Sequence, residues 1–182
     1  DNGAGKSTLI RILSGAQPAS AGEMRLDGGA RHFASPAQAL AAGIATTYQD
    51  LALAPRLSIA QNVFMGGELL RRPAWLGLLD KRRMRAEARQ YLARFGFAVD
   101  DMNRPVADLS GGQRQAVALA RALRWQARLV IMDEPTAALG VAESRAVLDL
   151  IRRLHEQGVA VLLVSHDMDH VVAVTQRVVV LK

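Results

Sequence analysis

The chain has 182 residues, half of them apolar, and a formal net charge of +6. This length and apolar fraction predict one globular domain with its own core and exclude a disordered chain. The absence of cysteine excludes disulfides and thiolate metal sites, and no apolar run approaches the roughly 20 residues that cross a bilayer.

The positive charge is concentrated between Arg71 and Arg94. This segment holds eight basic and two acidic residues, and the rest of the chain is neutral. Three interpretations remain open, in this order: a solvated helix surface, a site for anionic lipid headgroups, and a nucleic-acid contact.

The chain begins with the pattern of a phosphate-binding loop that continues into a helix. The residues concerned are Asp1, Asn2, Gly3, Ala4, Gly5, Lys6, Ser7 and Thr8. Small residues let successive backbone N–H groups face a polyphosphate, Lys6 would reach the β- and γ-phosphates, and Ser7 would ligate Mg²⁺. The alternative is an ordinary glycine-rich turn that caps a helix. We expect a glycine immediately before Asp1, preceded by an apolar strand.

Periodicity and capping residues predict the further elements. In chain order they are a helix over 6–14, a strand over 23–26, a helix over 36–42, a strand over 44–48, a helix from 58, a helix over 80–95, a helix over 113–123, a strand over 129–132, a helix that turns Val147, Leu148, Ile151 and Leu154 inward, a strand over 159–164, a brief helix after 168 and a strand over 178–181. Short apolar runs that alternate with helices indicate an α/β domain with a parallel sheet.

Two carboxylates, Asp133 and Glu134, follow the strand at 129–132. A phosphate-binding loop needs such a partner: Asp133 can hold Mg²⁺, and Glu134 can orient or deprotonate the water that attacks the γ-phosphate. The alternative is a pair of helix-capping acids.

A second anion-binding turn is predicted at Leu109-Ser110-Gly111-Gly112-Gln113, which opens a helix. One nucleotide does not need two such turns from one chain. We therefore expect two copies to associate head to tail, with each copy supplying one turn to the other's ATP. The alternative is a flexible Ser-Gly-Gly turn.

Together these motifs resemble the ATP-binding subunit of an ABC (ATP-binding cassette) transporter, over essentially the whole chain. The resemblance implies a P-loop NTPase fold, with a mainly parallel sheet flanked by helices and an inserted helical subdomain at about residues 50–124. It implies that residues 2–8 and 110–113 bind ATP. It also implies that Ser7, Gln49 and Asp133 hold Mg²⁺, and that Glu134, His166 and Gln49 act in hydrolysis. Without the resemblance, Gln49 is more simply interpreted as a surface residue, and His166 as a cap or a solvated side chain.

The chain departs from the family pattern in two places. Gly140 stands where the family has an aspartate after Ala138-Leu139, which puts the contact of that aspartate across the dimer in doubt. The strands expected before Asp1, with the residue that stacks on adenine, are absent. We therefore expect the 182 residues alone to be poorly stable and to bind ATP weakly.

The segments 33–36, 43–51 and 136–141 resemble bacterial importers of ribose, xylose and fructose. This implies a second ATPase domain, membrane permease subunits and a periplasmic solute-binding protein as partners, at the cytoplasmic face of the inner membrane.

The alternative is a soluble ABC ATPase that acts on nucleic acid or ribosomes. The 59 residues between Gln49 and Leu109 are too few for a long coiled-coil arm, which argues against nucleic acid. A non-hydrolysing cassette is disfavoured by Glu134 and His166, and a small GTPase or kinase by the second turn. The solute, the direction of transport and the number of fused cassettes stay open.

Overall fold

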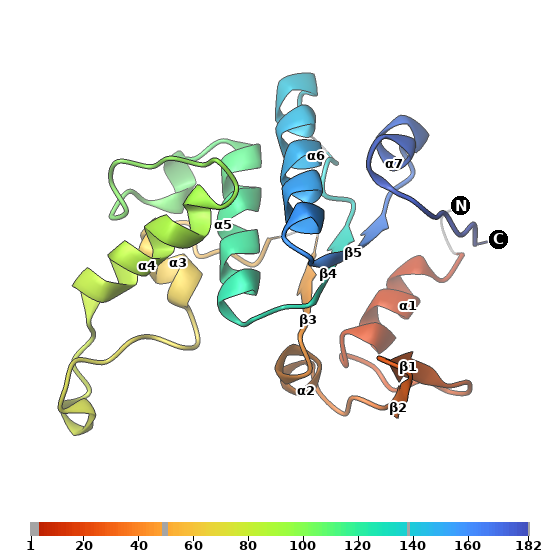
Figure 1. Ribbon diagram of the computed structural model, residues 1–182, viewed down its shortest axis with the longest axis horizontal. Helices are drawn as coiled ribbons and strands as arrows, with labels where there is room; N and C mark the ends of the chain where they lie inside the picture. The colour runs from red at the N-terminus through yellow and green to blue at the C-terminus, as the bar shows by residue number, and fades with distance from the viewer. Residues whose placement is uncertain (1–3, 49–50, 138, 182) are drawn as a thin grey trace.

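A three-stranded parallel sheet lies at the centre of the computed structural model, which describes residues 4–48, 51–137 and 139–181 (Figure 1). Its order is β3 (Ile44–Thr47), β4 (Leu129–Asp133) and β5 (Ala160–Val164). Thr47 lies opposite Met132, and Asp133 opposite Val164. All three strands therefore end at one edge, which confirms the predicted α/β class and the parallel sheet.

The two faces of the sheet pack on different helices, as alternation along each strand requires. Ile44 and Ile131 pack with Ile10 of α1 (Lys6–Leu13) in the smaller core cluster. Val130 and Met132 belong to the larger cluster, which includes the buried faces of α5 (Gly111–Arg124) and α6 (Val141–Glu156). The predicted inward set Val147, Leu148, Ile151 and Leu154 is confirmed as buried.

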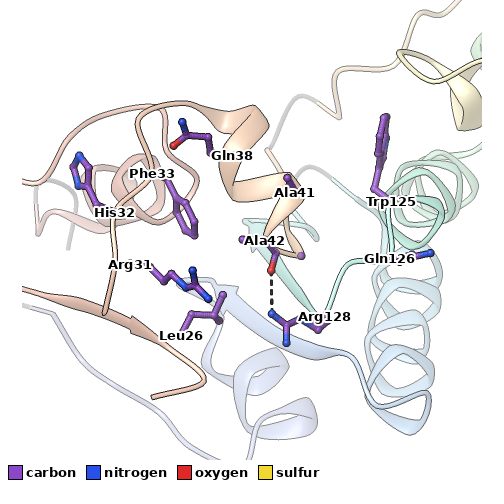
Figure 2. A pocket seen from close by; sticks show the side chains of 11 residues that line it. Leu26, Arg31, His32, Phe33, Gln38, Ala41, Ala42, Trp125, Gln126 and Arg128 are labelled. Atoms are coloured by element: carbon purple, nitrogen blue, oxygen red, sulfur yellow. Dashed lines mark hydrogen bonds between the residues drawn. The ribbon is translucent and has the colours of Figure 1, made fainter. Parts of the chain in front are cut away.

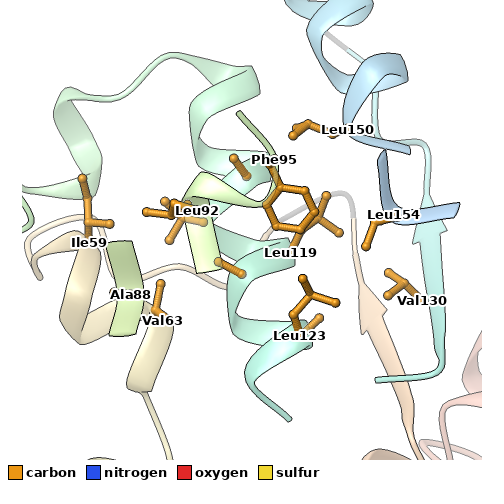
Figure 3. Close-up of a cluster of buried hydrophobic side chains, with 14 of the residues drawn as sticks. Ile59, Val63, Ala88, Leu92, Phe95, Leu119, Leu123, Val130, Leu150 and Leu154 are labelled. Atoms are coloured by element: carbon orange, nitrogen blue, oxygen red, sulfur yellow. The ribbon is translucent and has the colours of Figure 1, made fainter. Parts of the chain in front are cut away.

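A group of three helices lies beside the sheet. It consists of α3 (Ile59–Phe64), α4 (Lys81–Ala93) and α5, which all contact one another. Figure 3 shows Val63, Ala88, Leu92 and Leu119 meeting in their shared core. Two short 3₁₀ turns, η1 (Ala74–Leu76) and η2 (Val106–Asp108), occur in the connections. The helical subdomain at about residues 50–124 stays a prediction.

The remaining elements lie on the periphery. They are the antiparallel hairpin of β1 (Met24–Leu26) and β2 (Gly29–Arg31), α2 (Pro36–Ala41) against β3, and α7 (Met168–Val174) against α6. In the described part of the chain, no helix is both long and apolar enough to span a bilayer.

Side-chain caps account for most of the helix N-termini. Ser58 and Asp80 accept hydrogen bonds from the backbone of the first turns of α3 and α4, as N-caps do. Asn62 of α3 is fully buried: its Oδ1 accepts from the Ala54 N–H, and its Nδ2 donates to the carbonyls of Ala54, Leu57 and Ser58. This amide fixes the chain that leads into α3.

Two sequence predictions need correction. Residues 178–181 form no strand; Val179 and Val180 are exposed there, because an apolar run becomes a strand only where another strand pairs with it. Helix α5 begins at Gly111, two residues earlier than predicted, because Ser110 serves as its N-cap.

Candidate functional site

The phosphate-loop residues lead directly into α1. Gly5 adopts a left-handed conformation (φ 84°), which glycine does without strain, and Lys6, Ser7 and Thr8 form the first turn. Ala4 precedes this turn, whereas Asn2 and Gly3 lie outside the described residues. The first turn of α1 thus presents its N–H groups and the Ser7 hydroxyl at the start of the helix.

The predicted carboxylates lie at the end of β4. Asp133 is its last residue, and burial, with the charge of Glu134 as the smaller contribution, raises the pKa of the Asp133 carboxyl; Lys6 acts in the opposite direction. The structure therefore brings the charged ends of Lys6, Asp133 and Glu134 into one electrostatic neighbourhood, although they come from α1 and β4.

Glu134 has an unusual backbone conformation. Its φ is +50°, a left-handed value that costs a non-glycine residue about 1 kcal/mol. The backbone N–H of Glu134 donates to the carbonyl of Val164 at 2.9 Å, which continues the β4–β5 ladder for one more residue. The chain therefore bends at Glu134, directly after the last residue of β4.

His166 meets Glu134 directly. Its Nδ1 lies 2.9 Å from Oε1 of Glu134, and since a carboxylate can only accept, Nδ1 carries the proton in this contact. The His166 side chain is 80% exposed, whereas that of Glu134 is 19% exposed. The imidazole thus stands at the open side of a largely enclosed carboxylate.

Gln49 lies outside the described residues, so its predicted role stays a prediction. The segment that follows it is held by α5: the Arg121 guanidinium donates to the carbonyls of Leu51 and Ala52 at 3.1 and 2.9 Å. Burial lowers the pKa of Arg121. The chain after Gln49 is therefore attached to α5.

The second predicted anion-binding turn is a capping box at the start of α5. Ser110 Oγ accepts from the backbone N–H of Gln113, and Gln113 Oε1 accepts from the backbone N–H of Ser110 at 3.0 Å. Gly111 and Gly112 are buried between these two residues. Gln113 is thus engaged with the backbone of the turn, and its predicted contact with ATP stays a prediction.

Two residues that sequence reasoning missed join this turn to the loop that follows β4, which we call the carboxylate loop (residues 134–137 and 139–140). Oε1 of Glu143 accepts from the Gly111 N–H at 3.1 Å, and Oε2 accepts from the Gly140 N–H at 3.4 Å. Nε2 of Gln115, a side chain buried in α5, donates to the Pro135 carbonyl at 3.0 Å. An acid three residues after Gly140 is a helix-start signal that could have drawn attention to Glu143; nothing in the sequence distinguishes Gln115.

A cavity of about 360 Å³ lies where these elements meet. Glu134, Pro135 and Leu139 form one part of its lining, Gly111 and Gln115 another. The turn of α5 and the carboxylate loop therefore border the same space.

A larger cavity, of about 690 Å³, lies away from this chemistry. Figure 2 shows Arg31, Phe33, Trp125 and Arg128 around it, at the ends of β3 and β4 opposite to Asp133. Arg128 is engaged there with Asp27 at 2.7 Å and with the carbonyl of Ala42. The chemistry, and not the volume, identifies the candidate site.

The donor set beside Asp133 fits Mg²⁺. This ion prefers oxygen ligands, takes one or two from the protein and fills the rest with phosphate and water. The Asp133 carboxylate and the Ser7 hydroxyl could supply two such oxygen atoms, and burial raises the pKa of Asp133, whose ionised form a cation would stabilise.

Comparison with known proteins agrees with this geometry. Residues 1–137 match the ABC transporter family. The chain is 49% identical to the fructose import ATP-binding protein FrcA of Rhizobium meliloti, over 98% of this chain and 70% of that protein. It is 44% identical to the xylose/arabinose import ATP-binding protein XylG of Sulfolobus acidocaldarius, over 100% and 70%. It is 43% identical to the ribose import ATP-binding protein RbsA 2 of Burkholderia cenocepacia, over 100% of this chain and 35% of that protein, and thus spans about a third of this relative's length.

Solved structures share the fold. The ATP-binding cassette MJ1267 of an ABC transporter, in its ADP conformation, is 25% identical, with a TM-score of 0.78 over 93% of this chain and 69% of that one. The cassette MJ0796, a dimer in a post-hydrolysis state bound to ADP and Pi, is 26% identical, with a TM-score of 0.70 over 93% and 73%. A parallel sheet with its carboxylates at one edge, a phosphate-loop helix and these matches lead to one conclusion: the chain belongs to the ABC transporter family.

Proposed function

We propose that the chain binds and hydrolyses ATP as the motor part of an importer of a monosaccharide. The observation that carries the proposal is the contact of Glu134 with His166, beside Asp133 and Lys6, at the edge where β4 and β5 end. This edge is where open α/β sheets bind ligands.

Hydrolysis needs a water aimed at the γ-phosphorus, and Glu134 is suited to hold it. One carboxylate oxygen accepts from His166, which leaves the other to accept a hydrogen bond from the water and then its proton. The water oxygen bonds to phosphorus, the bond to the β-γ bridging oxygen breaks, and ADP leaves with that electron pair.

Charge on the phosphates is met by the chain's own cations and N–H groups. Lys6 and the first turn of α1 bind the β- and γ-phosphates, and the exposed Nε2 of His166 would donate to the γ-phosphate when the ring carries both protons. Asp133 and Ser7 would hold Mg²⁺, which supplies Lewis-acid stabilisation of the negative charge that develops on the phosphate oxygens.

A second copy completes the site. The Ser110 turn would bind the γ-phosphate of the partner's nucleotide, and the dimeric solved relative MJ0796 supports such an arrangement. The import names of the relatives support a membrane permease as a further partner and a place at the cytoplasmic face of the membrane. A periplasmic sugar-binding protein would deliver the solute. These names also support transport over the nucleic-acid alternative.

The test is Glu134→Gln in the full-length protein, with Mg-ATP. We expect hydrolysis to fall by about 10²- to 10⁴-fold, the range for loss of a general base, while ATP still binds and drives dimer formation measured by light scattering. Normal hydrolysis by this variant would contradict the role given to Glu134.

The solute is tested separately, by uptake of labelled ribose, xylose and fructose into cells with and without the intact gene. We expect uptake of one of these sugars to require Lys6. If cells that carry the Lys6→Ala variant still take up all three sugars as the parent cells do, the transport assignment is refuted. The ATPase assignment would stand.

A further inference from the structure

The connection from α3 to α4 contains a loop closed at its base, which we call the tip loop (residues 69–80). The backbone N–H of Arg71 donates to the carbonyl of Leu78 at 2.8 Å, and that of Asp80 donates to the carbonyl of Leu69 at 2.7 Å. Figure 1 shows this loop in yellow-green at the lower left, at the far end of the helical group from the sheets. The loop is therefore an ordered projection.

The tip loop exposes large apolar side chains, an arrangement that costs free energy in water. Trp75, in the 3₁₀ turn at its end, is 83% exposed, and no residue of that turn is buried. The exposed fractions of the leucines on either side are 42% for Leu70, 49% for Leu76, 55% for Leu78 and 36% for Leu79. Five large apolar side chains within ten residues are thus exposed on this loop.

Cations without partners border these apolar groups. Arg71, Arg72, Lys81 and Arg82 are exposed, and none of them forms a hydrogen bond or an ion pair through its side chain with another residue of the described ranges. The nearby acids are already engaged. Asp80 accepts from the backbone N–H of Arg83 as the cap of α4, and Glu68 accepts from the backbone N–H of Gly66.

We propose that the tip loop docks on the surface of a lipid bilayer that carries anionic headgroups. A tryptophan with neighbouring leucines matches the interfacial layer, where an apolar body enters and a polar N–H stays at headgroup level. Four unpartnered cations around it match lipid phosphates, each contributing about fivefold in affinity near an anionic surface. For these four cations the proposal selects the lipid interpretation of the basic segment, and it does not depend on the proposed function.

The experiment uses the full-length protein with vesicles of phosphatidylcholine, with and without phosphatidylglycerol. We expect binding by co-flotation only to the anionic vesicles, weakened by salt. The emission of Trp75, obtained as the difference between the protein and Trp75→Phe, should shift to the blue on binding. Trp125→Phe, which removes the other tryptophan of the chain, outside the tip loop, should leave this shift in place.

Charge reversal tests the cations. Arg71→Glu combined with Arg72→Glu should weaken vesicle binding at least about 25-fold, from about fivefold for each cation. The matched control, Arg145→Glu with Arg177→Glu, changes the same charge at positions elsewhere on the chain and should bind nearly as the parent does. All four positions are exposed, so thermal unfolding should be unchanged.

Three outcomes overturn the proposal. The first is the absence of binding to anionic vesicles, and the second is equal weakening of vesicle binding by the two double variants. The third is a blue shift of the Trp75 emission that occurs with nucleic acid, or with the membrane subunits in lipid-free detergent, but not with vesicles. The last result would assign the tip loop to a macromolecular partner and not to lipid.

Discussion

Removal of the Glu143 carboxylate should destabilise the protein by about 2 kcal/mol. Glu143→Ala leaves the buried N–H of Gly111 without its charged acceptor, and a buried donor without an acceptor costs about 1–3 kcal/mol. The second contact, to Gly140 at 3.4 Å, is long and adds little. In a domain of this size, 1 kcal/mol lowers Tm by about 2–4 °C, so a loss of about 4–8 °C is expected.

The measurement is urea unfolding and thermal melting of the full-length protein without nucleotide. Glu143→Gln keeps an acceptor oxygen and should lose about half as much stability. Glu156→Ala, at an exposed position of the same helix, should change stability by less than about 0.5 kcal/mol. If the Glu143→Ala variant has the same urea midpoint and Tm as the parent, the Glu143 carboxylate does not stabilise the start of α5, and the reasoning fails.

Three further changes test other parts of the structure. Asp133→Asn should raise the urea midpoint at neutral pH, because burial raises the pKa of this carboxyl and its ionised form therefore weakens the fold. The gain should shrink as pH falls through the raised pKa and vanish below the pKa of an aspartate in the unfolded chain, while Mg-ATP hydrolysis is lost at every pH. Asn62→Ala should cost about 3 kcal/mol or more in urea unfolding, because it leaves buried backbone groups around α3 unpaired, and a loss under about 1 kcal/mol would contradict this. Gly15→Ala would place a Cβ 2.5 Å from the Ser35 carbonyl oxygen, whereas Gly28→Ala meets open space at a similar positive φ; we expect the former to be the more destabilising by at least about 1 kcal/mol, and equal losses would exclude the overlap as the cause.

Features set by neighbouring residues could be predicted from the sequence. Ser58 and Asp80 were identifiable as N-caps because a cap acts on N–H groups three residues away. The strand that ends at Asp133 was identifiable because a short apolar run that leads into two acids is typical of a buried strand with its carboxyl end at a binding edge.

Features set by distant residues could not be predicted in the same way. The contact of Glu134 with His166 joins residues 32 positions apart and depends on the register of β4 with β5, which no local pattern specifies. The same holds for Glu143 and Gly111. The strand expected at 178–181 is wrong for the same reason, since strand formation depends on a neighbour that the run itself does not encode.

The two attachments of α5 have a mechanical consequence. Gln115 connects this helix to Pro135, the residue after Glu134, and Glu143 connects its first turn to Gly140, farther along the same loop. A displacement of the Ser110 turn by a partner would therefore reach the backbone that follows Glu134 within the same copy. In a pair of such chains, a displacement caused by the neighbour's nucleotide at the Ser110 turn would be transmitted through α5 to the loop after β4. The two hydrolysis events would then not be independent.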